Sequence, residues 1–170
     1  MQLSLHSDYA LRVLIYLGSH PGKTVSTREI SQGYGISRHH LVRVVQTLGE
    51  HGFVELLPGR SGGVRLAQDP NRIRLGDVVM KAEPNLRLVE CFDAATNTCP
   101  IISCCGLRSL LKGALDEFLR SLNQHTLAEL LTPSRRSTLA ATFIQLRRLE
   151  PAAGRATRRE PTPRGKASAD

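Results

Sequence analysis

Apolar residues in the first half of the chain recur at the spacing of short amphipathic helices. Residues 7–18 carry such a stripe, and Pro21-Gly22 ends the predicted helix. A second helix is expected from residue 27 to about residue 33, because Ser26 and Glu29 have the spacing of a capping box. After a turn at Gly35, Ser37 can cap a third helix over 38–50. Its apolar stripe consists of Leu41, Val44, Val45 and Leu48.

The next segments read as strands joined by turn-forming residues. Residues 53–57 and 63–66 predict two short strands, and Pro58-Gly59-Arg60-Ser61-Gly62 predicts the turn of a hairpin between them. Two helices, a tight turn and a Gly-rich hairpin follow the order of a winged helix-turn-helix. We therefore expect a mainly α-helical protein with a winged helix-turn-helix, a small β-hairpin wing and a long C-terminal helix.

The second half of the chain predicts one short and one long helix. The short helix spans 75–83 and is stopped by Pro84, and the long helix spans 106–123 with the strongest helical periodicity of the sequence. Between them, residues 85–105 lack helical periodicity and contain every cysteine. In the Arg-, Ala-, Thr- and Pro-rich segment 132–170, we expect a short helix over 138–148 and disorder elsewhere.

The predicted recognition helix, 38–50, has a polar face opposite its apolar stripe. Side chains on this face and on the wing can bind phosphate oxygens and base edges of DNA. The candidate DNA-binding residues are Ser37, Arg38, His39, His40, Arg43, Gln46, Arg60 and Arg65. A merely solvated polar face is the alternative, which the adjoining hairpin and the local positive charge disfavour. Adjacent histidines on a helix point in different directions, so His39 and His40 are not expected to chelate one ion.

The distribution of charge matters more than the overall net charge of +8. Residues 132–170 hold nine Lys/Arg and three acidic residues, so much of the basicity belongs to this segment. Residues 1–75 hold nine Lys/Arg and five acidic residues, whereas residues 76–131 hold five and seven. This change of sign favours a first half that faces phosphates. No apolar run is long enough to span a bilayer, and no cleavage site follows residues 1–17, which predicts a cytoplasmic protein without membrane contact.

Four cysteines lie in one short segment. Cys91, Cys99 and Cys105 have seven and five residues between them, which is too far for a zinc-knuckle pair and too irregular for one helical face. In a reducing compartment such thiols are expected to be ligands or redox groups. Their spacing suits a loop that wraps a polynuclear cluster, although small soft side chains filling a loop core remain the alternative. Cys104 is an extra thiol that could compete as a ligand or be oxidised.

Several motifs in the same order resemble the Rrf2 family of bacterial transcription regulators, and within it the nitric-oxide-sensing repressors. The resemblance covers about residues 1–131. It rests on Ser7-Asp8-Tyr9-Ala10-Leu11-Arg12, Tyr34-Gly35-Ile36-Ser37, the wing over 59–66, residues 73–79, the cysteine segment and residues 125–130.

The resemblance implies a homodimeric repressor that binds palindromic double-stranded DNA, with the helix over 106–123 packing against its partner. Cys91, Cys99 and Cys105 would hold an iron–sulphur cluster, 4Fe-4S by resemblance and 2Fe-2S as the alternative. Asp8 of the partner subunit would be the fourth ligand, whereas a helix N-cap is the other role open to Asp8. A carboxylate binds iron weakly compared with a thiolate, so one iron would stay open to nitric oxide, the expected signal.

Relatives within this family leave alternatives open. A histidine ligand of some members stands three residues after the last cysteine, where this chain has Arg108. Iron-sensing members share the cysteine spacing, so an iron-responsive or redox-responsive regulator is the main alternative, and a cluster-free winged-helix protein is another. Many relatives carry an arginine in the wing where this chain has Pro58, which would shift a minor-groove contact to Arg60 or Arg65. Cys104 and Cys105 lack a nearby catalytic base, so an enzyme is not expected.

The chain is thus predicted to have four parts. Residues 1–84 form the winged-helix DNA-binding domain and residues 85–105 the cluster-binding loop. Residues 106–131 form the dimerisation helix and a short following helix, and residues 132–170 form a basic, disordered tail.

Overall fold

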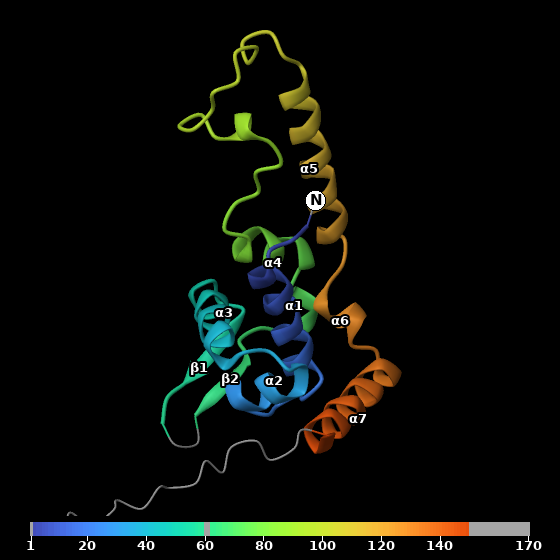
Figure 1. Ribbon diagram of the computed structural model, residues 1–170. Helices are drawn as coiled ribbons and strands as arrows, with labels where there is room; N and C mark the ends of the chain where they lie inside the picture. The colour runs from blue at the N-terminus through green and yellow to red at the C-terminus, as the bar shows by residue number, and fades with distance from the viewer. Residues whose placement is uncertain (1, 60–61, 150–170) are drawn as a thin grey trace, which may run out of the picture.

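In the computed structural model, which describes residues 2–59 and 62–149, the N-terminal half is a winged helix (Figure 1). Helix α1 (Leu5–Gly18) precedes α2 (Thr27–Tyr34) and α3 (Arg38–Glu50). Strands β1 (Val54–Leu57) and β2 (Gly63–Leu66) form an antiparallel hairpin. The predicted fold class is confirmed, and the expected bounds of these five elements are correct to within two residues.

Local hydrogen bonds explain where the helices of the helix-turn-helix begin and end. Ser26 N donates to Glu29 Oε2 at 2.8 Å and Glu29 N donates to Ser26 Oγ at 3.2 Å, which is the predicted capping box. Gly35 ends α2 with a φ of 64°, a left-handed conformation that glycine adopts without strain. Ser37 is the N-cap residue of α3, as predicted, but among the described residues its side chain accepts no capping hydrogen bond from α3.

The chain then leaves the winged helix and returns to it. After the 3-10 turn η1 (Pro70–Arg72), helix α4 (Leu75–Ala82) packs against α1. The cysteine-containing segment, here called the cysteine loop (residues 83–106), includes the 3-10 turn η2 (Glu90–Phe92). Helix α5 (Leu107–Asn123) leads back to α4, and Figure 1 shows the loop and the far end of α5 projecting away from the winged helix.

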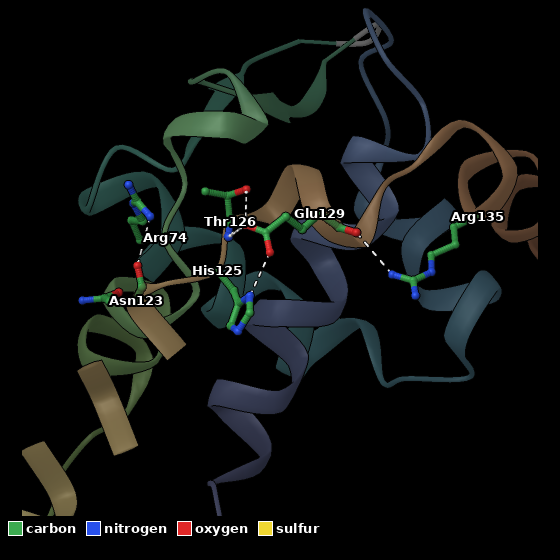
Figure 2. Close-up of polar contacts among 6 residues, drawn as sticks. All are labelled: Arg74, Asn123, His125, Thr126, Glu129 and Arg135. Carbon is green, nitrogen blue, oxygen red and sulfur yellow. Dashed lines mark hydrogen bonds and ion pairs between the residues drawn. The ribbon is translucent and has the colours of Figure 1, made fainter. Parts of the chain in front are cut away.

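Backbone hydrogen bonds close the base of this excursion. Leu75 N donates to His125 O at 3.0 Å, and Leu127 N donates to Ile73 O at 2.9 Å. Figure 2 shows the junction, where Arg74 Nη1 donates to the carbonyl oxygen at position 123 over 3.1 Å. Helix α6 (Leu127–Leu130) begins directly after it. Residues 73–75 and 125–127 therefore fix where the excursion starts and ends.

One apolar core joins these elements. It takes residues from α1, α2, α3, both strands, α4 and α6, and its largest fully buried side chains include Tyr16, Leu14, Ile30, Leu41 and Ile73. Leu41, Val44, Val45 and Leu48 are all buried, as the apolar stripe of α3 predicted. Across the part of the chain that the structure describes, each helix is too short or too polar to cross a membrane.

Helix α7 (Pro133–Leu149) differs from the prediction of a largely disordered tail from residue 132. It begins five residues before the short helix expected over 138–148 and packs against α2. Phe143 is only 3% exposed, and its ring centroid lies 4.6 Å from that of Tyr16 and 5.0 Å from that of Tyr34. Phe143, with the partly buried Leu139 beside it, thus packs α7 against the core. The rest of the predicted tail, 150–170, lies outside the described residues.

Candidate nucleic-acid interface and cysteine loop

The solvent-facing side of α3 carries most of the predicted DNA-binding residues. Ser37 at its start and the helical residues Arg38, His39, His40, Arg43 and Gln46 are exposed. The opposite side of the helix is buried in the core. This arrangement leaves four positively charged or titratable side chains and an amide free to reach a groove of DNA.

Two side-chain contacts from α1 hold the exposed side of α3 in place. His6 Nε2 and Thr47 Oγ1 are hydrogen-bond partners 3.2 Å apart. The Tyr9 ring stacks on the His40 ring, with a centroid separation of 6.3 Å and an interplanar angle of 29°. Thr47, which the sequence places on the polar face, is therefore partly covered by α1. The first turns of α1 and the exposed side of α3 are therefore in direct contact.

On the wing, the charge of Arg65 is already paired. Glu55 lies opposite Arg65 in the strand register, and Arg65 Nη2 lies 2.7 Å from Glu55 Oε2. Arg65 Nε donates to the same oxygen at 2.8 Å. Both side chains are about half exposed, so the pair faces solvent. Arg60, the other predicted wing contact, lies outside the described residues.

A groove of about 560 Å³ separates the wing from the helix-turn-helix. Arg38 and Gln46 of α3 line one side, and residues 56–58 and 62–64 of the wing line the other. Ser26 and Thr27 at the start of α2 complete the lining. Sequence reasoning gave Ser26 only a capping role, although the capping box itself places the positive end of the α2 dipole at this point. The groove places a guanidinium and an amide, both suited to a nucleic-acid backbone, beside apolar residues of α3 and the wing, while the Glu29 carboxylate already occupies the start of α2.

All four cysteines are free thiols on the cysteine loop. Cys91, Cys99 and Cys105 are partly buried, and Cys104 is exposed. Residues 2–59 and 62–149 contain no group of three His, Cys, Asp or Glu side chains placed to hold a metal ion. The three predicted thiol ligands share one loop, but this conformation does not bring them together.

The donor chemistry of the loop nevertheless fits an iron–sulphur cluster. Three thiols that are not in disulfides, in a segment with little regular secondary structure, are the ligands that such clusters take. Because loop residues have few fixed packing contacts, closing the loop would disturb little of the core. Cluster binding therefore requires a rearrangement of residues 91–105.

Two carboxylates, which sequence reasoning missed, organise the cysteine loop. Glu90 accepts hydrogen bonds from Thr98 N and, at 2.7 Å, from Thr98 Oγ1, and these bonds lower the pKa of Glu90. Asp93 accepts from Thr96 Oγ1 at 2.9 Å and from Ala95 N at 3.1 Å. These bonds, with Arg87 as a smaller cause, lower the pKa of Asp93. The spacing Asp93-x-x-Thr96 was the local signal for this turn.

Asp8 lies inside α1 rather than at its cap. The N-cap is Ser4, whose Oγ accepts from Ser7 N at 3.2 Å, so the alternative of Asp8 as the helix cap is wrong. Arg12 Nη2 lies 2.8 Å from Asp8 Oδ2, one helical turn away. The hydrogen bond from Arg12 Nε to Asp8 Oδ1, 3.0 Å long, is the main cause of a raised pKa of Arg12. Asp8 is thus held by a charged neighbour in its own chain.

Helix α5 presents apolar side chains to solvent. Leu107 and Leu110 are 55% and 72% exposed, whereas Leu115 is buried. Ala114, one turn after Leu110, is also exposed. Exposed leucines at helical spacing on a projecting helix are typical of a surface that another chain covers.

Comparisons with known proteins agree with this architecture. The family model of Rrf2, described as an iron-dependent transcriptional regulator, matches residues 3–133. The HTH-type transcriptional regulator NsrR of Bacillus subtilis is 44% identical over 132 residues, which are 77% of this chain and 90% of that protein. NsrR of Halalkalibacterium halodurans is 46% identical over 133 residues, 78% of this chain and 91% of that protein.

Two solved structures share the fold. IscR of T. potens has a TM-score of 0.63 at 22% identity and covers 81% of this chain and 90% of its own. The global cysteine regulator CymR of B. subtilis has a TM-score of 0.58 at 25% identity, with coverage of 76% and 95%. The family match ends at residue 133, where α7 begins, so α7 lies almost entirely outside the segment shared with the family model.

Proposed function

Because the chain belongs to the Rrf2 family of transcriptional regulators, we propose that it is a homodimeric repressor whose operator binding depends on an iron–sulphur cluster. The motif resemblance to nitric-oxide-sensing repressors adds nitric oxide as the signal that releases the DNA. The observation that carries the proposal is the placement of three free, partly buried thiols on a loop that extends from α4, which itself packs on the winged helix.

Binding of palindromic DNA would use the exposed side of α3. Arg38, His39 and Arg43, which are exposed, would enter the major groove, while the exposed Ser37, His40 and Gln46 would bind phosphates or base edges. Arg65 would add a backbone contact once it exchanges Glu55 for a phosphate. Arg60, at the tip of the wing sequence, is proposed as a further DNA contact, although it lies outside the described residues.

The exposed leucines of α5 would form the contact between the two subunits. Leu107 and Leu110 are large apolar side chains left in solvent, and their burial by a second copy would be favourable by about 25 cal/mol for each Å² removed from water. A two-fold dimer brings two copies of α3 to one face, as a palindromic operator requires.

Cys91, Cys99 and Cys105 would hold the cluster, with Asp8 of the partner subunit as the fourth ligand. We propose a 4Fe-4S cluster, whose iron supplies a reactive centre for nitric oxide when it is bound. This chain's own contribution is to bring the thiols together by closing residues 91–105 and to release Asp8 from Arg12. Cys104, exposed beside Cys105, is not assigned as a ligand.

Anaerobic purification followed by iron and sulphide analysis tests the cofactor. Cys91→Ser, Cys99→Ser and Cys105→Ser should each lose iron, whereas Cys104→Ser, the matched control, should keep it. Wild-type protein that holds zinc or no metal would refute the cluster.

Titration of nitric oxide into the anaerobic cluster-bearing protein tests the signal, with cluster absorbance and operator binding followed together. We expect both to be lost in parallel. Operator binding that changes with iron concentration but not with nitric oxide would instead indicate an iron-responsive regulator. The family model is described as an iron-dependent transcriptional regulator, which agrees with that alternative. Operator binding that is unchanged after cluster removal would indicate a cluster-free regulator.

A further inference from the structure

The first residue of the cysteine loop is tied to the first turn of α1. Glu83 directly follows α4, and its Oε2 atom accepts hydrogen bonds from Ser4 N at 3.2 Å and from Ser4 Oγ at 3.1 Å. Ser7 Oγ donates to the same oxygen, and Ser7 is completely buried. One carboxylate oxygen therefore accepts three hydrogen bonds from the start of a helix nearly eighty residues away in sequence.

This contact is stronger than a typical surface hydrogen bond. Hydrogen bonds to a charged acceptor are roughly twice as strong as neutral ones, and a carboxylate at a helix N-terminus also gains from the helix dipole. If Glu83 moved away, the buried Ser7 hydroxyl would lose its charged acceptor and would retain Ser4 Oγ, 3.2 Å away, as a neutral and weaker partner. The first turn of α1 is therefore expected to follow Glu83 when Glu83 moves.

The first two turns of α1 also contact the recognition helix. His6 bonds to Thr47 of α3, and Tyr9 stacks on His40 of α3. Asp8 lies between these two residues. A displacement of Glu83 would reach both the proposed cluster ligand and the DNA-facing side of α3 through two consecutive contacts.

The start of the loop has room to move. A crevice of about 150 Å³ adjoins Glu83 and is lined by Leu3, Asn85, Leu88 and Phe118, so the first loop residues are not tightly packed against α5. Pro84 prevents α4 from continuing past Glu83. A conformational change of the cysteine loop would therefore reach Glu83 before it reaches α4.

We propose that Glu83 is a positioning residue that transmits the state of the cysteine loop to α3 through the first turn of α1. This inference rests on the proposed function, because it assumes that the loop has two states with different operator affinity. If Glu83 only stabilised α1, its substitution would lower the stability of the protein but leave the ratio of operator affinities of the two loop states unchanged.

The test compares Glu83→Ala with Glu129→Ala. Glu129 also accepts from a helix start, with Thr126 N donating to its Oε1 at 3.0 Å, but it lies at α6, away from the contacts between α1 and α3. Operator affinity is measured for the cluster-bearing and cluster-free forms of each full-length variant. We expect Glu83→Ala to reduce the ratio of the two affinities about fivefold or more, within the usual range of allosteric coupling, and Glu129→Ala to preserve the ratio.

A second measurement does not need the cluster. Hydrogen exchange of cluster-free protein should show faster exchange of the α3 amides in Glu83→Ala than in Glu129→Ala, at matched global stability. Glu83→Gln keeps the shape of the side chain but removes its charge, and it replaces Glu83→Ala if that variant does not fold. We expect Glu83→Gln to increase the exchange of the α3 amides by less than Glu83→Ala does. Unchanged α3 exchange in Glu83→Gln, or an affinity ratio equal to that of Glu129→Ala, would overturn the proposal. If wild-type protein binds the operator equally with and without its cluster, the proposed function fails, and the exchange measurement still decides whether Glu83 acts on α3.

Discussion

Asp77 and Asn123 exchange two hydrogen bonds across the junction between α4 and α5. Asn123 Oδ1 accepts from Asp77 N at 2.8 Å, and Asn123 Nδ2 donates to Asp77 Oδ1 at 3.0 Å. The Asn123 amide lies against Gly76, where an added Cβ would be 2.5 Å from Asn123 Oδ1. This contact sets the position of the proposed dimerisation helix relative to the helix that packs on α1.

Replacement of Asn123 by alanine should lower the free energy of unfolding by about 1–3 kcal/mol, because Asp77 N and Oδ1 both lose their partner in a partly buried site. Urea denaturation at constant protein concentration measures the change. Gln124→Ala, at the exposed neighbouring position, is the control and should change stability by less than about 0.5 kcal/mol. Equal effects of the two substitutions would contradict the role of this junction.

Replacement of Phe143 by alanine should release α7 from α2. The side chain is almost fully buried among Tyr16, Tyr34 and Gly33, and Phe→Ala changes at buried sites cost about 3–5 kcal/mol. Because α7 packs mainly against α2, we expect local undocking rather than global unfolding, seen as rapid proteolysis within 133–149. Ile144→Ala, at a position 52% exposed, should leave the cleavage rate unchanged. Similar cleavage of both variants would show that Phe143 is not the anchor.

Replacement of Glu55 by glutamine should strengthen DNA binding. The change frees Arg65 from its ion pair and removes a negative charge from the wing. If Arg65 then neutralises one more phosphate, the slope of log K against log salt should become steeper by about 0.9. Binding isotherms over a range of salt concentrations measure the slope. The double variant Glu55→Gln/Arg65→Gln should lose the gain, and a gain that persists there would assign the effect to charge removal alone.

The cysteine loop should keep its turns in mildly acidic solution. The pKa values of Glu90 and Asp93 are lowered by hydrogen bonds from Thr98 and Thr96, so these carboxylates favour the ordered loop while they are ionised. Their contribution is complete above the unfolded pKa values of about 4.3 and 3.9, and is lost as pH falls through the lower folded values. Thr98→Val removes one donor to Glu90 and should raise the pKa of Glu90 in an NMR titration. An unchanged pKa would mean that the Thr98 hydroxyl does not bond to Glu90 in solution.

Local patterns predicted the winged helix because its signals lie close together in sequence. The buried stripe that includes Leu41 and Leu48 and the capping box of Ser26 and Glu29 each act within one helix or at its end. The helix expected over 138–148 lies within α7, but its start at Pro133 was missed because the described part of the helix packs on the core mainly through Leu139 and Phe143, which lie beyond its first turn.

Local sequence patterns also predicted only part of the candidate site. Cysteine spacing identified a set of donors, but spacing along a loop does not determine whether the thiols meet in space. The pairing of Asp8 with Arg12 follows from positions one helical turn apart and was open to local reasoning. The contact between Glu83 and Ser7 joins distant segments, and no local pattern predicts it.

The closure of residues 73–75 on 125–127 has an evolutionary consequence. Because the chain is joined again at the base, the segment between α4 and α5 can vary in length or composition while the ends that enter and leave the DNA-reading domain stay where they are. Sensory loops with quite different chemistry could be exchanged on one unchanged scaffold. A chimera that carries a foreign sequence between residues 84 and 106 should still fold its winged helix, while the proposed cluster-dependent operator binding should be lost with Cys91, Cys99 and Cys105.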